Sequence, residues 1–258
     1  MQNRYVGDIG DFGKYGLLRY LVGMFDCEKR LRLGVLWYLV SDEFHNNDGA
    51  KTQYLFQSDS VQFEACDSPL YQALRSVVTT SSRSVEAIQG LNVLPPDTAF
   101  AAEPLVMTPN GKRRTVQNRL ERRQRWVERS HKATETCDIV FADPDNGLEC
   151  PSVQPHDLRG PKYAFIEDLS PIIARGQSLV VYHHTCRKGT AEAQVRSKLR
   201  ALRLGANQSA FGLLFRRGSS RAFLIFPVDE HKRLLKDRVR SMLDSPWNKH
   251  FTLISEDM

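Results

Sequence analysis

The sequence predicts an α/β fold in which a mostly parallel sheet closes with an antiparallel hairpin. Short apolar runs that end in polar residues alternate with longer segments of helical periodicity, which is typical of parallel sheets with crossover helices. Toward the C-terminus, the apolar runs 210–215 and 221–228 are separated only by Arg-Arg-Gly-Ser-Ser, which is a hairpin signal. We therefore expect one α/β domain over residues 1–258.

The helices are predicted from apolar periodicity. In residues 11–25, Leu17, Leu18 and Leu21 fall at near-helical spacing. Residues 50–95 have mostly helical character and are expected to form a helical insertion within the domain. Further helices are expected at 112–132, 163–175 and 191–204.

The strands are expected in the apolar runs between these helices. Residues 32–40 form the strongest such run and lead into a polar loop. The other strands are expected at 98–102, 139–142, 178–182, 210–215 and 221–228. A parallel α/β sheet that closes with an antiparallel hairpin is the pattern of the class I methyltransferase fold, a Rossmann-type arrangement, and this is the fold class that we predict.

Composition narrows the class of protein. The chain is 41% hydrophobic and 26% charged, an ordinary globular balance. No apolar run approaches the ~20 residues of a membrane helix, and the start does not resemble a signal peptide, so we expect a cytoplasmic protein with no membrane partner. The five cysteines form no C-x-x-C pair, which predicts neither a zinc site nor a disulfide framework. A net charge of +6 and a pI near 9.1 mildly favour an anionic partner.

The most informative segment is Asp-Ile-Val-Phe-Ala-Asp-Pro-Asp-Asn-Gly at residues 138–147. It predicts a buried strand that places Asp143 and Asp145 at its carboxyl end, where open α/β sheets bind ligands. The alternative is a polar turn, because turn chemistry alone explains Asp-Pro-Asp-Asn-Gly. We take Asp143, Pro144, Asp145 and Asn146 as candidate catalytic residues.

The N-terminal segment 7–15 combines three glycines with Asp8, Asp11 and Lys14. Its glycines permit close backbone approach or a positive φ. The alternative is a polar arm in which Asp11 caps a helix. We predict that Lys14 and Asp11 contribute to a cofactor site.

Polar residues also follow two of the other predicted strands. The loop after residues 32–40 contains His45, Asp48 and Gly49, at a position that binds ligands in nucleotide-binding folds, although the usual glycine-rich fingerprint is absent. The run 178–182 leads into His183 and His184. Adjacent strand residues point to opposite faces, so at most one histidine can enter a common site.

Segment 112–132 is crowded with arginine and lysine. One interpretation is a solvated helix face, and the other is a surface that contacts the phosphates of RNA or DNA. The candidate nucleic-acid contacts are Arg113, Arg114, Arg119, Arg122 and Arg123.

Three blocks resemble the large-subunit ribosomal RNA adenine-N6 methyltransferase J family. That family opens with Gly-Asn-His-Ala-Asp-Val-Leu-Lys-His, which segment 7–15 matches at Gly7, Asp11 and Lys14. Its Leu-Asp-Thr-His-Ala-Gly-Ala-Gly is similar to the loop at His45 and Gly49, and its catalytic Asp-Pro-Pro-Tyr is similar to residues 143–146. The chain more closely resembles a group of bacterial uncharacterised proteins that share Gly-Asp-Ile-Gly-Asp-Phe-Gly-Lys-Tyr-Gly, Asp-Pro-Asp-Asn-Gly-Leu-Glu and Tyr-His-His.

The methyltransferase resemblance implies an S-adenosylmethionine pocket lined by Lys14, His45 and Asp143. In that family the aspartate accepts a hydrogen bond from the target amine, the proline carbonyl holds that amine, and an aromatic residue stacks on the base. Here Asn146 stands in the aromatic position, so the acceptor is left open. Asp143 and Pro144 would orient the acceptor, and Asp145 or His183 would take its proton.

A second hypothesis is a metal-dependent nuclease or phosphodiesterase. Oxygen-rich sites suit Mg²⁺ or Mn²⁺, and His184 would act as a base or ligand. The candidate metal ligands in this alternative are Asp8, Asp11, Asp48, Asp143, Asp145 and His184. A third possibility is a binding module without catalysis, in which the acids only cap helices.

Overall fold

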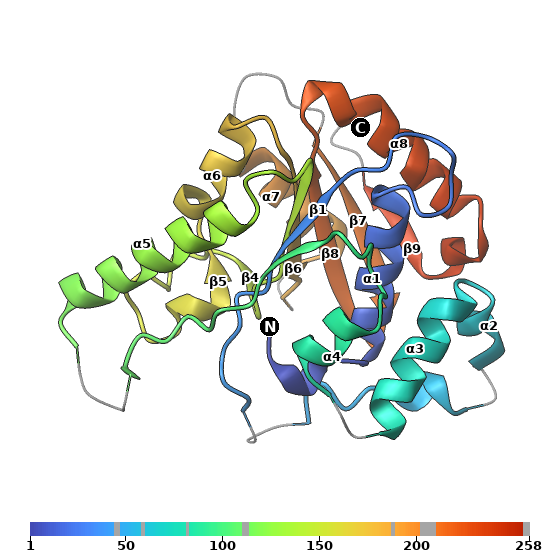
Figure 1. Cartoon of the computed structure of the whole chain (residues 1–258), viewed down its shortest axis with the longest axis horizontal. Coiled ribbons are helices and arrows are strands. Elements are labelled where there is room, and N and C mark those ends of the chain that lie inside the picture. Colours follow the sequence, from blue (N-terminus) through green and yellow to red (C-terminus); the bar gives the residue numbers. More distant parts are fainter. Residues whose placement is uncertain are drawn as a thin grey trace.

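The computed structural model describes residues 1–43, 47–57, 60–80, 83–109, 114–186, 189–201 and 210–254. Within these residues, seven strands form one sheet in the order β2-β1-β3-β6-β8-β7-β9 (Figure 1). The strands are β1 Leu33–Leu36, β2 Ala99–Ala101, β3 Ile139–Ala142, β6 Ser178–His184, β7 Phe211–Arg217, β8 Ser219–Phe226 and β9 Phe251–Ile254. The chain is therefore an α/β protein, as predicted.

The sheet is mixed but mostly parallel. Strand β1 pairs in parallel with β2 and β3, and β3 pairs in parallel with β6. Strand β8 then runs antiparallel to both β6 and β7, so β7 points the same way as the parallel strands. Strand β9 is antiparallel to β7 and closes this edge. The predicted hairpin is confirmed, whereas the edge strand β9 was not predicted.

Helices cover both faces of the sheet (Figure 1). The main helices are α1 Ile9–Leu21, α3 Ser68–Thr79, α5 Val116–Ala133, α6 Ile166–Ala174, α7 Ala191–Ala201 and α8 Asp229–Leu243. Two apolar clusters lie on opposite sides of the strands: Val35 and Phe141 pack with residues of α1, α3 and α8, while Leu36 and Val140 pack with residues of α5, α6 and α7. Such alternation is what a sheet buried on both faces requires.

The expected helical character of 50–95 is found in short pieces. They are the 3-10 turn η2 Gln53–Leu55, α2 Ser60–Glu64, α3 and α4 Val85–Gly90. Tyr54, Phe63 and Leu74 belong to the same apolar cluster as Phe12 of α1, so these pieces pack on the main core.

Two expected elements have different limits in the structure. The run 32–40 is a strand only to Leu36, because the backbone turns at the buried Tyr38, whose φ is +43°. The expected helix 163–175 begins as β5 Tyr163–Ala164, which pairs in parallel with β4 Gly147–Leu148, and becomes α6 only at Ile166. Among the described residues, no helix has the length and apolar character needed to cross a bilayer.

Candidate functional site

A cavity of about 300 Å³ opens at the carboxyl ends of β3 and β6. Four of the predicted segments meet there: the start of α1, the loop after β1, the end of β3 and the end of β6. The predicted residues that line it are Asp8, Asp11, Lys14, Asp48, Gly49, Asp143, Pro144, Asp145, Asn146 and His184. His45 and Arg113 lie outside the described residues. We call this space the acidic cavity.

Lys14 lies at the centre of the charged residues in the acidic cavity. Its Nζ is 2.7 Å from Oδ1 of Asp11 and 2.7 Å from Oδ2 of Asp143, and all three side chains are almost completely buried. Although burial acts to lower the pKa of Lys14, the two carboxylates outweigh it and raise that pKa, so the ammonium stays charged. For Asp143, burial raises the pKa and the nearby Lys14 only partly offsets it.

Asp8 holds the start of α1 and also anchors Arg221. Its Oδ1 accepts hydrogen bonds from the backbone N–H groups of Gly10 and Asp11, at 2.7 and 3.0 Å. Its Oδ2 lies 3.2 Å from a guanidinium nitrogen of Arg221 on β8. The helix cap is therefore Asp8, and the alternative in which Asp11 caps the helix is wrong: the Asp11 carboxylate accepts from Gly7 N–H.

The two carboxylate oxygens of Asp145 differ, because one accepts hydrogen bonds and the other accepts none from the described residues. Its Oδ2 accepts from Nε2 of Gln2 at 2.9 Å and lies 3.3 Å from Nζ of Lys162. Its Oδ1 is buried and makes no hydrogen bond with the part of the chain that the structure describes. Burial acts to raise the pKa of Asp145, but the adjacent amino group of Met1 and the Gln2 and Lys162 contacts lower it overall. The acidic cavity thus contains an ionised acceptor that lacks a donor.

The amino group of Met1 lies among these carboxylates, and burial lowers its pKa although Asp145 and Asp143 act to raise it. It donates to the carbonyl oxygens of Tyr38 and Asp143, at 3.0 and 3.2 Å, and lies 4.0 Å from Oδ1 of Asp145. It therefore bridges the carboxyl ends of β1 and β3. One of these two carbonyls belongs to Tyr38, whose backbone has a positive φ. The turn that ends β1 at Leu36 therefore also places a carbonyl that binds the Met1 amino group.

The structure separates the two histidines at the end of β6. His184 lines the acidic cavity, and its Nε2 lies 3.0 Å from the hydroxyl of Tyr182. His183 does not line that cavity: its Nδ1 accepts from Leu148 N–H at 3.1 Å, on the other side of the strand. Burial lowers the pKa of His183 to about 3 and that of His184 to about 4, so both rings are neutral. His183, a candidate catalytic residue, therefore does not line the cavity that contains Asp143.

The basic segment forms helix α5, but its arginines are not all on the surface. Arg123 is buried, pairs with Asp168 and donates to the carbonyls of Gly160 and Tyr163. Its role as a nucleic-acid contact is therefore corrected to a structural one, since a buried guanidinium with these partners cannot reach a phosphate. Arg119 and Arg122 donate to the carbonyls of His156 and Val106.

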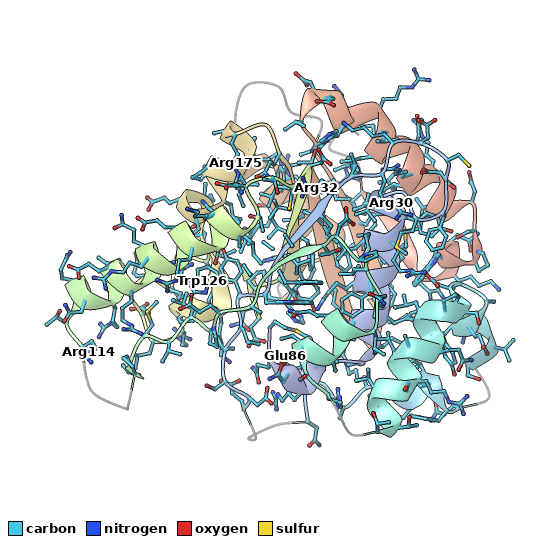
Figure 2. All side chains as sticks on the ribbon, viewed as in Figure 1. Arg30, Arg32, Glu86, Arg114, Trp126 and Arg175 are labelled. Atoms are coloured by element: carbon cyan, nitrogen blue, oxygen red, sulfur yellow. The ribbon has the colours of Figure 1, made fainter. Side chains whose placement is uncertain are left out.

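The exposed part of α5 retains some positive charge. Arg114, which precedes the helix, is exposed (Figure 2), and α5 itself has two exposed arginines that were not among the candidate contacts. Of these, Arg125 lies 3.5 Å from Glu121, and Arg129 pairs with Glu103 at 2.6 Å. The helix is thus partly neutralised by its own neighbours, which leaves a weaker positive surface than the sequence indicates.

The carboxylates do not converge as ligands of one metal ion. Among the described residues, no group of three His, Cys, Asp or Glu side chains is placed to hold a metal. Asp11 and Asp143, which would be ligands in the nuclease hypothesis, instead face the ammonium of Lys14. The alternating charges of the cavity suit an organic ligand with several donors better than a bare cation.

Sequence reasoning missed the residues that complete the acidic cavity, chiefly Arg221 and Tyr182. Arg221 stands in the hairpin strand β8, which carries no motif, and reaches the cavity only because β8 pairs with β6. Gly10 is the residue that could have indicated a large side chain at this position. A Cβ at Gly10 would lie 2.5 Å from Nε of Arg221, so the glycine leaves space for the Arg221 side chain. Comparisons with protein-family models, curated proteins and solved structures found no match to this chain.

Proposed function

We propose that this protein is an S-adenosylmethionine-dependent methyltransferase that acts on RNA or another nucleic acid. The observation that carries the proposal is the position of Asp143-Pro144-Asp145-Asn146, at the carboxyl end of β3 and in the same cavity as the start of α1 and the loop after β1. The sheet order supports it, because a reversed strand, β8, lies between β6 and β7, as in the class I methyltransferase fold.

The residues of the acidic cavity fit this cofactor. Asp145 offers a buried acceptor without a donor, and the cofactor has an ammonium group, hydroxyl groups and an amine that can donate. Asp48 and Asp145 supply negative charge that favours a sulfonium cation. The volume is at the lower end of the range of ~300–1,000 Å³ typical of small-molecule sites. Asp145, Asp48 and the backbone at Gly49 would hold the cofactor.

The chemistry expected of the chain is mainly positioning. When bound, S-adenosylmethionine supplies a methyl group on a positively charged sulfur that a nucleophile can attack directly. Asp143 is held by Lys14, and Pro144 also lines the cavity, so the Asp143 carboxylate and the Pro144 carbonyl would orient the nucleophile. Because its lowered pKa keeps Asp145 ionised, its carboxylate would accept a hydrogen bond from the cofactor, while Asp143 and Pro144 orient the acceptor.

The decisive test is calorimetric titration with S-adenosylmethionine. We expect binding by the wild-type protein and a loss of about 10- to 100-fold in affinity for Asp145→Asn, since a hydrogen bond to a charged group contributes ~1.5–3 kcal/mol. Asp244→Asn is the matched control, because Asp244 is exposed on the far end of α8 and does not line the cavity. No binding by the folded wild-type protein would refute the proposal, and the next titrations would use Mg²⁺ and Mn²⁺.

Nucleic-acid binding is tested separately. We expect single-stranded RNA to bind with an affinity that falls steeply with salt, because contacts with phosphates release counterions. Arg114→Gln should weaken binding, whereas Glu121→Gln should strengthen it slightly by freeing Arg125 from its ion pair. Salt-independent binding, or no binding at low salt, would refute the nucleic-acid part of the proposal and leave the cofactor part standing.

A further inference from the structure

A second cavity, of about 640 Å³, lies beside the acidic cavity. It is formed by the end of β6, strand β4 and helix α7, and its wall includes Leu148, Tyr163 and Ala193. Asn146 and His184 line both cavities, so the two spaces meet at these residues. We call the second space the neighbouring cavity.

The lining of the neighbouring cavity is close to neutral. His183 and His184 are uncharged, because burial lowers both of their pKa values. Lys198 is the cation in the described lining, and its ammonium donates to the Glu149 carbonyl at 2.8 Å. A neutral and largely apolar ligand is therefore better matched to this cavity than a highly charged one.

The hydrogen bonds around His184 indicate which ring nitrogen carries its proton. Arg221 donates from Nε to the hydroxyl oxygen of Tyr182 at 3.1 Å, and a guanidinium can only donate. With one lone pair occupied by Arg221, the Tyr182 hydroxyl is placed to donate its proton to Nε2 of His184, which lies 3.0 Å away. A neutral ring that accepts at Nε2 carries its proton on Nδ1.

The Nδ1–H group of His184 is the donor in this series of hydrogen bonds that can bind a ligand. Among the described residues, Nδ1 of His184 takes part in no recorded hydrogen bond, and His184 lines both cavities. Its N–H group is therefore available to a ligand at the junction of the two cavities. In the nuclease hypothesis His184 would be a base, whereas these contacts present it as a hydrogen-bond donor.

We propose that the neighbouring cavity binds the acceptor substrate through an uncharged, largely apolar ring whose unprotonated nitrogen or carbonyl oxygen receives the Nδ1–H hydrogen bond of His184. Tyr182 and Arg221 are then positioning residues, which act through His184. This inference rests on the proposed function, because the ring is an acceptor substrate only if the protein transfers a methyl group. The cavity and the hydrogen bond can be tested without any cofactor.

The first experiment determines the His184 tautomer by ¹⁵N NMR of the imidazole nitrogens in the full-length protein. Substitution His184→Gln assigns the signals. We expect the Nδ1–H tautomer in the wild-type protein and a shift toward the Nε2–H form in Tyr182→Phe, which has lost the hydroxyl proton. Tyr163→Phe, which removes a hydroxyl from the neighbouring cavity alone, should leave the tautomer unchanged. An Nε2–H ring in the wild-type protein would overturn the proposal.

The second experiment compares pyridine with benzene, which differ chiefly in the ring nitrogen. Binding is followed at pH 8 by chemical-shift changes in the residues of both cavities. We expect pyridine to bind the wild-type protein about 2- to 10-fold more tightly than benzene, the range for one net hydrogen bond, and expect that preference to vanish in His184→Phe. Equal affinities, or shifts confined to the acidic cavity, would overturn the proposal.

A titration with S-adenosylmethionine in the presence of pyridine separates the two proposals. If both molecules bind together, the neighbouring cavity is distinct from the cofactor site. If pyridine binds as expected but the cofactor does not, the methyltransferase proposal fails and the ring-binding site remains. If the cofactor binds but pyridine shows no preference over benzene, only the inference about His184 is overturned.

Discussion

Substitution of Lys14 by methionine tests whether the charged centre of the acidic cavity is held together as the structure indicates. Methionine keeps most of the side-chain length but removes the ammonium that lies 2.7 Å from both Asp11 and Asp143. Asp11 keeps hydrogen bonds from Gly7 N–H and from the Tyr15 hydroxyl. Asp143 loses its principal counter-charge while remaining 1% exposed.

The least costly response of the Lys14→Met variant is protonation of Asp143. At pH 7, protonation of a carboxyl with an ordinary pKa of about 3.9 costs about 4 kcal/mol, at ~1.36 kcal/mol per pH unit. This value agrees with the ~3–5 kcal/mol expected when one partner of a buried ion pair is removed. We therefore expect the free energy of unfolding to fall by about 4 kcal/mol at pH 7.

Protonation of Asp143 also makes the effect of Lys14→Met depend on pH. Burial already raises the pKa of Asp143, and the loss of Lys14 raises it further. A carboxyl with a raised pKa in the folded state favours folding when protonated, so stability is lost as the pH rises through that pKa. The loss caused by Lys14→Met should therefore shrink to about 1.5 kcal/mol at pH 5, where protonation from about 3.9 spans about 1 pH unit.

Urea unfolding followed by circular dichroism at pH 5 and pH 7 measures both quantities. The double variant Lys14→Met with Asp143→Asn is the control, because it has no charge at position 143 and should lose less stability at pH 7 and show little pH dependence. Asp143→Asn alone should change stability by about 1 kcal/mol or less, since Lys14 keeps Asp11 as its partner. A loss below 1 kcal/mol, or an equal loss at both pH values, would refute the reasoning.

Three further predictions concern folding. Gly147→Ala should destabilise the protein by about 2–4 kcal/mol in urea unfolding, because its φ is +104° and a Cβ would lie 2.4 Å from Nδ1 of His183; an unchanged midpoint would contradict this close contact. Arg123→Met should cost about 3–5 kcal/mol, whereas the exposed Arg125→Met should stay within about 0.5 kcal/mol; a loss of RNA affinity without a loss of stability in Arg123→Met would restore its role as a contact. The free energy of unfolding should fall as the pH drops below about 6.5, the ordinary pKa of histidine, because burial lowers the pKa of His183 to about 3 and that of His184 to about 4. In this range the unfolded chain binds protons at these two histidines that the folded chain does not bind. His183→Gln should reduce the dependence of unfolding free energy on pH.

The fold class followed from the sequence because its signals are local. The run 139–142 is apolar throughout and is bounded by polar residues, and it coincides with β3. The hairpin also depends on a short turn, here at Gly218, with a φ of +72°. By contrast, β9 is only four residues long and half exposed, so its pairing with β7 is a tertiary effect that no local pattern indicates.

The candidate site was only partly predictable for the same reason. The positions of Asp143 and Asp145 follow from one strand and the turn after it, which is local information. The choice between His183 and His184 depends on which face of β6 meets the acidic cavity, and only the assembled sheet fixes that. The burial of Arg123 likewise follows from the packing of α5 against Asp168, since an arginine-rich helix does not reveal which of its arginines faces inward.

The glycines of α1 explain how an apparently poor helix sequence builds this site. Three glycines of α1, at positions 10, 13 and 16, follow a three-residue spacing that places them along one side of the helix, and helix propensity alone would favour alanine at these positions by up to ~1 kcal/mol each. A Cβ at Gly13 would lie 2.8 Å from the Phe215 ring, and one at Gly16 would lie 2.2 Å from Trp247.

Packing should therefore outweigh propensity on this side of α1. We expect Gly13→Ala to lower the free energy of unfolding by about 1–3 kcal/mol, the range for an overpacked core, because it pushes α1 away from β7. Gly90→Ala in α4 is the matched control, since no atom lies within 4 Å of a Cβ there, and it should be neutral or stabilising. If Gly13→Ala instead stabilises the protein, the close approach of α1 to the sheet is not what places Asp8, Asp11 and Lys14 at the acidic cavity.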